Sequence, residues 1–192
     1  LQDDLSVSLL ETGASNSMTI SMQVDVPPFD NVKVREALKL VVDRQAMIDT
    51  VLLGFGEPGA DNPVPISNPA SYVSEAPMPD IEKAKALLAE AGFADGLKFD
   101  LYTAEGVPGM VRMAQVYAEM ARPAGIDVNV VVTPAESYWD DVWLKKPIVT
   151  SAWSMRPPGE GLAVAYVQTA KWKETHWERP DYDALLQSAN TT

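Results

Sequence analysis

The stretch from Pro27 to Gly59, PPFDNVKVREALKLVVDRQAMIDTVLLGFGEPG, constrains the fold more than any other part of the chain. After its two opening prolines, Asp30 or Asn31 can cap a helix. Apolar residues then recur at the spacing of one helix face. Asp43 predicts the cap of a second helix, and Gly54 predicts its end. We therefore expect two successive amphipathic helices, with inward residues Val34, Ala37, Leu38, Val41 and Val42 in the first and Met47, Ile48, Val51 and Leu52 in the second.

Helical and strand patterns alternate along the rest of the chain, which favours an α/β fold with a mixed sheet flanked by helices. Asp80 predicts the cap of a third helix, and a long proline-rich loop, 54–79, precedes it. Loops of that length are often functional or act as lids. We expect one domain over residues 1–192, with strands at 18–25, 97–102, 126–133 and 148–154, and helices at 81–91, 107–122, 135–144, near 160–168 and from Asp181.

The composition excludes several classes of function. The chain has 192 residues and a formal net charge of −12, so it repels phosphate backbones, and we expect no nucleic-acid partner. It has no cysteine, which excludes thiol catalysis, disulfides and cysteine-ligated zinc. No apolar run reaches the ~20 residues of a membrane helix. Because the chain starts with Leu1 and stops in a helical pattern, we expect a fragment of a longer protein.

Metal and catalytic signals are weak. The one histidine, His176, lies beside Glu174, and a lone histidine in a polar loop is usually structural. The Asp140-Asp141 pair lacks the spacing of a calcium loop. We therefore expect no metal and no cofactor. No serine has the flanking glycines of a nucleophile elbow. An acid-dependent hydrolase or transferase that uses His176 stays open as an alternative.

Aromatic residues gather in the last third of the chain, where they either fill a core or line a ligand wall. Trp153, followed by Ser154, is the best candidate for a ligand contact because it ends a predicted strand, and ligands of open α/β sheets bind at the carboxyl ends of strands. Arg156 follows in a loop stiffened by two prolines, and its planar guanidinium suits a carboxylate. The alternative for Arg156 is a surface salt bridge to Glu160.

Several motifs, in a fixed order over nearly the whole chain, resemble family 5 of the extracellular solute-binding proteins, which serve peptide, nickel and opine-type importers. The strongest is EKAKALLAEAG, from Glu82 to Gly92. The others are Pro27-Pro28-Phe29-Asp30, Val34-Arg35-Glu36-Ala37-Leu38, Asp43-Arg44, Gly54-Phe55-Gly56, Gly125-Ile126-Asp127-Val128 and Pro180-Asp181-Tyr182-Asp183-Ala184-Leu185-Leu186.

The resemblance implies a longer protein with two lobes that close over a solute, of which this chain forms one lobe. It implies an exported, periplasmic, monomeric protein that makes and breaks no bonds and delivers its solute to the permease subunits of an ABC importer. A lone lobe should bind solute weakly, since half of the walls are missing. A sensory ligand-binding domain on the same fold is a further alternative.

The resemblance also implies where solute binds. Peptide-binding members place an acidic residue shortly after the tryptophan that matches Trp153, where it holds the amino group of the peptide. Here that position is Arg156, which cannot hold an ammonium group, and this departure favours an anionic solute such as an opine, a sugar acid or an amino-acid conjugate. From the opening stretch we expect solute contacts only at its exit, near Gly56 to Asn62, with Asp61 and Asn62 as the candidates.

Overall fold

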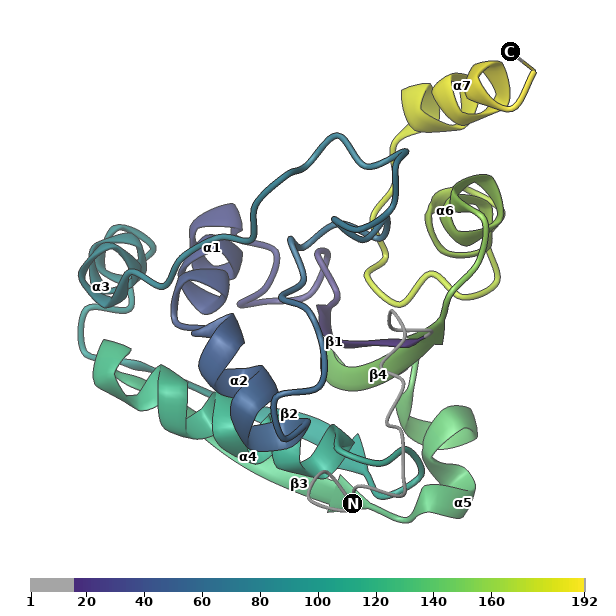
Figure 1. Cartoon of the computed structure of the whole chain (residues 1–192). Coiled ribbons are helices and arrows are strands. Elements are labelled where there is room, and N and C mark those ends of the chain that lie inside the picture. Colours follow the sequence, from purple (N-terminus) through teal and green to yellow (C-terminus); the bar gives the residue numbers. More distant parts are fainter. Residues whose placement is uncertain (1–15, 192) are drawn as a thin grey trace, which may run out of the picture.

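The computed structural model describes residues 16–191, so the start at Leu1 lies outside the described residues. A mixed sheet of four strands is flanked by helices, as the sequence predicts (Figure 1). The elements are β1 (Asn16–Met22), α1 (Val32–Leu40), α2 (Arg44–Val51), α3 (Ile81–Glu90), β2 (Leu97–Ala104), α4 (Met110–Ala121), η1 (Arg122–Ala124), β3 (Ile126–Thr133), α5 (Ala135–Ser137), η2 (Tyr138–Val142), β4 (Ile148–Ser154), α6 (Pro158–Tyr166) and α7 (Pro180–Ala189).

The sheet is mixed, and its strand order is β1-β4-β2-β3. Strand β1 runs antiparallel to β4, whereas β2 runs parallel to both β3 and β4. The carboxyl ends of β2, β3 and β4 therefore share one edge of the sheet. Because β4 lies between two neighbours, its residues Ile148 to Ser151 are buried, and the strand becomes accessible only toward Ser154.

Three helices begin where an amide or carboxylate side chain accepts a backbone hydrogen bond. Asn31 accepts from the amide of Lys33 at 3.0 Å, and Asp43 accepts from that of Ala46 at 3.0 Å. Asp80 does the same for α3, accepting from Lys83 N at 2.9 Å. Of the two caps considered for α1, the structure uses Asn31.

The main core lies between the sheet and helices α1, α3 and α4. Strand β2 alternates, so Leu97, Phe99 and Leu101 face this core while Lys98 and Asp100 are exposed. The ring of Phe99 meets that of Phe29 edge to face, with centroids 5.3 Å apart. Full burial of one such apolar side chain stabilises the fold by about 1.5–3 kcal/mol. Helix α1 contributes Val34, Ala37 and Leu38, and α4 contributes Ala114, Tyr117 and Ala121.

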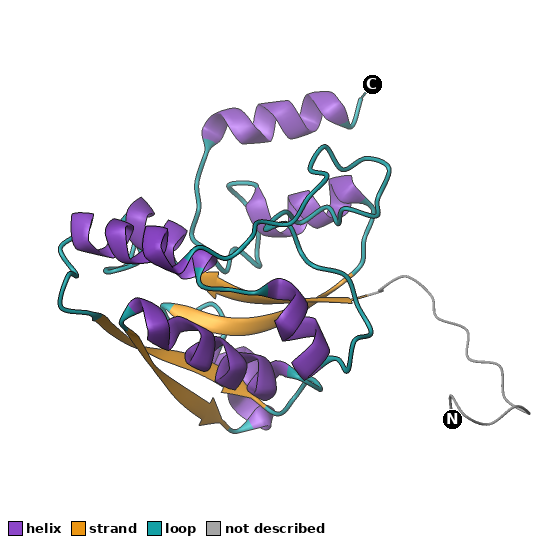
Figure 2. Cartoon of the chain, turned by 60° about the vertical axis from the view of Figure 1, so that its left-hand side comes forward, coloured by secondary structure: helices purple, strands orange, loops and turns teal. Residues whose placement is uncertain are grey.

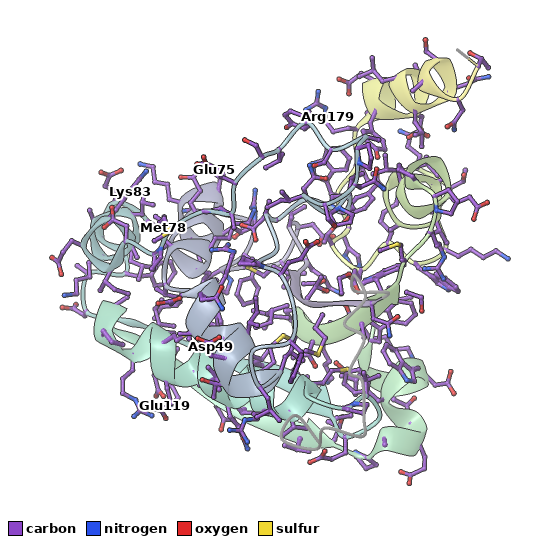
Figure 3. All side chains as sticks on the ribbon, viewed as in Figure 1. Asp49, Glu75, Met78, Lys83, Glu119 and Arg179 are labelled. Atoms are coloured by element: carbon purple, nitrogen blue, oxygen red, sulfur yellow. The ribbon has the colours of Figure 1, made fainter. Side chains whose placement is uncertain are left out.

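The outer faces of these helices are charged. Lys83 on α3 and Glu119 on α4 point away from the sheet and lie at the surface (Figure 3). Helices α6 and α7 lie to one side of the sheet, at the yellow-green end of the chain (Figures 1 and 2). Among residues 16–191, no helix is both long enough and apolar enough to cross a membrane.

The long loop 54–79 is held to the start of α2 by one arginine. Arg44, whose side chain is 11% exposed, donates from Nη2 to both carboxylate oxygens of Asp61 at 2.9 Å. Its Nη1 donates to the carbonyl of Pro77 at 2.9 Å. One side chain thus ties two points of the loop to the same place.

The largest differences from the predicted element boundaries occur at three elements. Strand β1 ends at Met22, because its partner begins at Ile148, opposite Met22. Helix α4 starts at Met110, after Gly109 at a φ of 91°. The helix expected over 135–144 is instead the single turn α5 followed by η2, a π-helical turn in which Trp143 N donates to Tyr138 O at 2.9 Å.

Candidate functional site

Trp153 and Ser154 end strand β4, as the sequence predicts, and Arg156 lies in the link between β4 and α6. Ser154 is exposed and Trp153 is half-buried. The guanidinium carbon of Arg156 lies 5.8 Å from the ring centroid of Trp153 and 5.5 Å from that of Trp172. Its Nη1 donates to the carbonyl of Ser154 at 3.1 Å. Arg156 therefore stacks on aromatic rings, and none of the ion pairs within residues 16–191 joins it to Glu160.

Three tryptophans from separate parts of the chain form the platform beneath Arg156. The ring centroids of Trp143 and Trp153 are 6.3 Å apart, those of Trp143 and Trp172 are 6.1 Å apart, and those of Trp153 and Trp172 are 6.0 Å apart. We call Trp143, Trp153 and Trp172 the tryptophan platform. Trp172 is 38% exposed, so part of the platform faces solvent. A partly exposed aromatic surface next to a guanidinium is suited to an organic solute that carries an anionic group.

Glu174 is buried and accepts hydrogen bonds from two of these rings. The residue is 8% exposed. Oε1 accepts from Ser21 Oγ at 2.6 Å and from Trp153 Nε1 at 3.0 Å. Oε2 accepts from Trp143 Nε1 at 2.7 Å. The carboxylate therefore links β1, β4 and the residue after η2 to the segment that follows α6.

The charge of Glu174 is balanced by hydrogen bonds rather than by a direct ion pair. None of the ion pairs between described residues includes it. A buried carboxylate is costly unless donors surround it, and here three neutral donors do so. Its charge affects a neighbouring phenol: burial, followed by the negative charge of Glu174, raises the pKa of Tyr166 to about 12.

A second aromatic group joins α6 to α7. The ring of Trp177 lies 6.4 Å from that of Tyr166 and 5.2 Å from that of Tyr182, measured between centroids. These three residues are half-buried, whereas Tyr138 is 1% exposed and belongs to the core. The aromatic residues of the last third therefore divide between the core and a partly accessible surface, and the role of that surface as a ligand wall stays a prediction.

The contacts of Asp61 and Asn62 do not involve the tryptophan platform. Asp61 binds Arg44, and its Oδ2 is 3.7 Å from Lys39 Nζ. Asn62 Oδ1 accepts from the backbone amide of Val64 at 2.9 Å. The structure thus brings Trp153, Ser154 and Arg156 together, but it uses Asp61 and Asn62 to shape the loop. Their role in binding solute stays a prediction.

The side chain of His176 faces the carboxylate of Asp25, and the backbone of His176 has a positive φ of 55°. Its Nδ1 lies 2.9 Å from Asp25 Oδ1 and 3.1 Å from Asp25 Oδ2. Asp141 lies 3.8 Å from Lys145 Nζ. In the part of the chain that the structure describes, no three His, Cys, Asp or Glu side chains come together as metal ligands would.

Sequence reasoning missed the role of Glu174, which it treated only as a neighbour of His176. The signal that could have found it is an acid inside the aromatic segment WKETHW. That pattern cannot name the partners, because they lie 21, 31 and 153 residues away along the chain.

Known proteins resemble this chain over most of its length. The model of bacterial extracellular solute-binding proteins, family 5 (middle), matches residues 1–173. Heme-binding protein A of Haemophilus influenzae is 36% identical over 148 residues, which are 73% of this chain and 26% of that protein. The glutathione-binding protein GsiB of Salmonella choleraesuis is 36% identical over 130 residues, which are 66% of this chain and 25% of that protein.

Solved structures agree with the sequence matches. HbpA2 from Haemophilus parasuis superposes with a TM-score of 0.81 at 28% identity, over 98% of this chain and 39% of that one. The chain spans about a quarter of the length of its curated relatives. The family and these relatives are named for binding, not for catalysis, and they give no support to the hydrolase or transferase alternative. The chain belongs to family 5 of the bacterial extracellular solute-binding proteins.

Proposed function

We propose that this chain is one lobe of the solute-binding component of an ABC-type importer. In this proposal the complete protein is exported to the periplasm, acts as a monomer and delivers a small organic solute to membrane permease subunits. Family membership supports the proposal, as does a half-exposed aromatic surface at the carboxyl end of a sheet strand. Binding consists of hinge closure over the solute, driven by higher affinity for the closed state.

The stacked Arg156 is the single observation that carries the proposed solute class. A guanidinium has five N–H donors, and among residues 16–191 Arg156 has one hydrogen-bond acceptor, the carbonyl of Ser154. Stacking on Trp153 and Trp172 orients the planar group, so that donors at its edge can bind a carboxylate in a forked geometry. Heme and glutathione, after which two relatives are named, both carry carboxylates. We propose an organic anion, peptide-like or opine-like, as the solute.

Calorimetry on the full-length protein tests this function. The ligands to titrate are the small molecules that mass spectrometry finds co-purified with the protein, together with glutathione and hemin. The Arg156→Ala variant should lose about 10- to 100-fold in affinity for an anionic ligand, the usual worth of a charge-assisted hydrogen bond.

The matched control is Arg122→Ala. Arg122 is exposed and pairs with Glu119 at 2.8 Å on the outer side of α4, so its removal should leave ligand affinity unchanged. Unchanged affinity for an anionic ligand after Arg156→Ala would refute the proposed role of Arg156.

A further inference from the structure

Glu174 connects the parts of the site that lie far apart in sequence. It belongs to the segment after α6, which is itself fixed because Val24 N donates to Thr175 O at 2.8 Å. Its three donors come from β1, from the end of β4 and from the residue that follows η2. Figure 1 shows β1 and β4 side by side, with the chain after α6 passing close to them.

The hydrogen bonds require a carboxylate rather than an amide. The two indole N–H groups donate to different oxygens, Trp153 to Oε1 and Trp143 to Oε2. A glutamine of the same shape has one acceptor oxygen, and its NH₂ group would face the second indole N–H, donor against donor. One of the two rings would therefore lose its acceptor and its fixed orientation.

The orientation of the rings decides where Arg156 lies. The guanidinium contacts Trp153, which Glu174 holds directly, and Trp172, which packs on both Trp143 and Trp153. The negative charge at the Nε1 edges of these rings also attracts a cation that stacks on their faces. Both effects keep the guanidinium on the tryptophan platform, and both weaken when the carboxylate is lost.

We propose that Glu174 is the positioning residue of the solute site: its ionised carboxylate fixes the Trp143 and Trp153 rings and, through them, holds Arg156 ready for the anion. The solute part of this inference rests on the function proposed above. Glu174 itself does not contact the solute, since it is buried and both of its oxygens are engaged.

The indole N–H resonances of the full-length protein, observed by ¹H–¹⁵N NMR, test the positioning role without any ligand. In Glu174→Gln, the Nε1–H signals of Trp143 or Trp153 should shift, while that of Trp177, which packs on Tyr166 and Tyr182, stays in place. Glu160→Gln, an exposed acid in the first turn of α6, is the control and should move none of these signals. Unmoved Trp143 and Trp153 signals in Glu174→Gln overturn the inference.

A second variant covers the case in which Glu174→Gln does not fold. Trp143→Phe keeps a ring against Trp153 and Trp172 but removes the donor to Oε2. The freed carboxylate should then shift the Trp153 Nε1–H signal, and an unmoved signal contradicts the inference.

Titration with benzoate, and with neutral benzamide as its counterpart, tests the link to the solute. Benzoate should bind Glu174→Gln at least about threefold more weakly than wild type, whereas benzamide affinity should not change. Equal benzoate affinity in the two proteins refutes the link while leaving the proposed function intact. If wild type binds no benzoate but the indole signals shift as expected, the proposed solute class fails and the positioning role stands.

Discussion

Tyr138 shows at the scale of one residue how burial and hydrogen bonding combine. The residue is 1% exposed, and its hydroxyl donates to the carbonyl of Thr150 at 2.5 Å. Burial raises its pKa to about 12; the Thr150 hydrogen bond opposes this shift, and the charge of Glu174 adds to it. The phenol therefore stays neutral in the folded protein at pH values where an unfolded chain would begin to ionise.

This raised pKa predicts a loss of stability in alkali. The unfolded phenol ionises near pH 10 and the folded one near 12, so the stabilisation is complete below pH 10 and is lost as the pH rises toward 12. Thermal melts followed by circular dichroism between pH 9 and 12 should show a falling Tm, with a shallower fall in Tyr138→Phe. Tyr72→Phe, at a residue that is 92% exposed, should follow wild type. Identical pH slopes for Tyr138→Phe and wild type would contradict this account.

Sequence reasoning reached some residues of the candidate site and not others. Trp153 and Arg156 could be predicted because strand periodicity and two prolines place them at a strand end. Trp172 and Trp143 could not be joined to them, since ring contacts between distant segments leave no local pattern. The stacking of Arg156 likewise depends on where α6 returns the chain, which the sequence alone does not determine.

Helix caps are the features that the sequence predicts best at the scale of elements. Capping is a local interaction over three residues, and so Asp43 and Asp80 are found where expected. The turn from α5 into η2 was missed for the opposite reason. Tyr138 lies in the core and Val142 packs in the same cluster, and these tertiary contacts override a simple helical period.

Removal of one cap should cost a measurable fraction of stability. Asp80→Ala deletes the acceptor for Lys83 N and should lower the free energy of unfolding by about 1 kcal/mol, measured by urea denaturation. Asp95→Ala is the matched control, because Asp95 is exposed and outside any helix, and it should change little. A wild-type midpoint for Asp80→Ala would show that the cap contributes nothing to stability.

At the scale of the whole molecule, the platform and Arg156 supply one wall of the proposed site. The chain spans about a quarter of its curated relatives, and the remaining walls belong, in our proposal, to the other lobe. Residues 1–192 alone should therefore bind the anion that the full-length protein selects at least about 100-fold more weakly, because half of the contacts and hinge closure are lost. Calorimetry on the two proteins checks this, and nanomolar binding by the short chain would overturn it.

The hydrogen bonds of Arg44 to both Asp61 and Pro77 affect how the sequence of this fold can change in evolution. Because Asp61 and Pro77 are fixed at one point, the segment 62–76 forms a loop whose two ends do not depend on its length. Each doubling of such a loop costs only about 0.6 kcal/mol in closure entropy. Insertions and deletions can therefore accumulate between these residues without disturbing α2 or the core, and the same segment is a natural place to graft a reporter peptide.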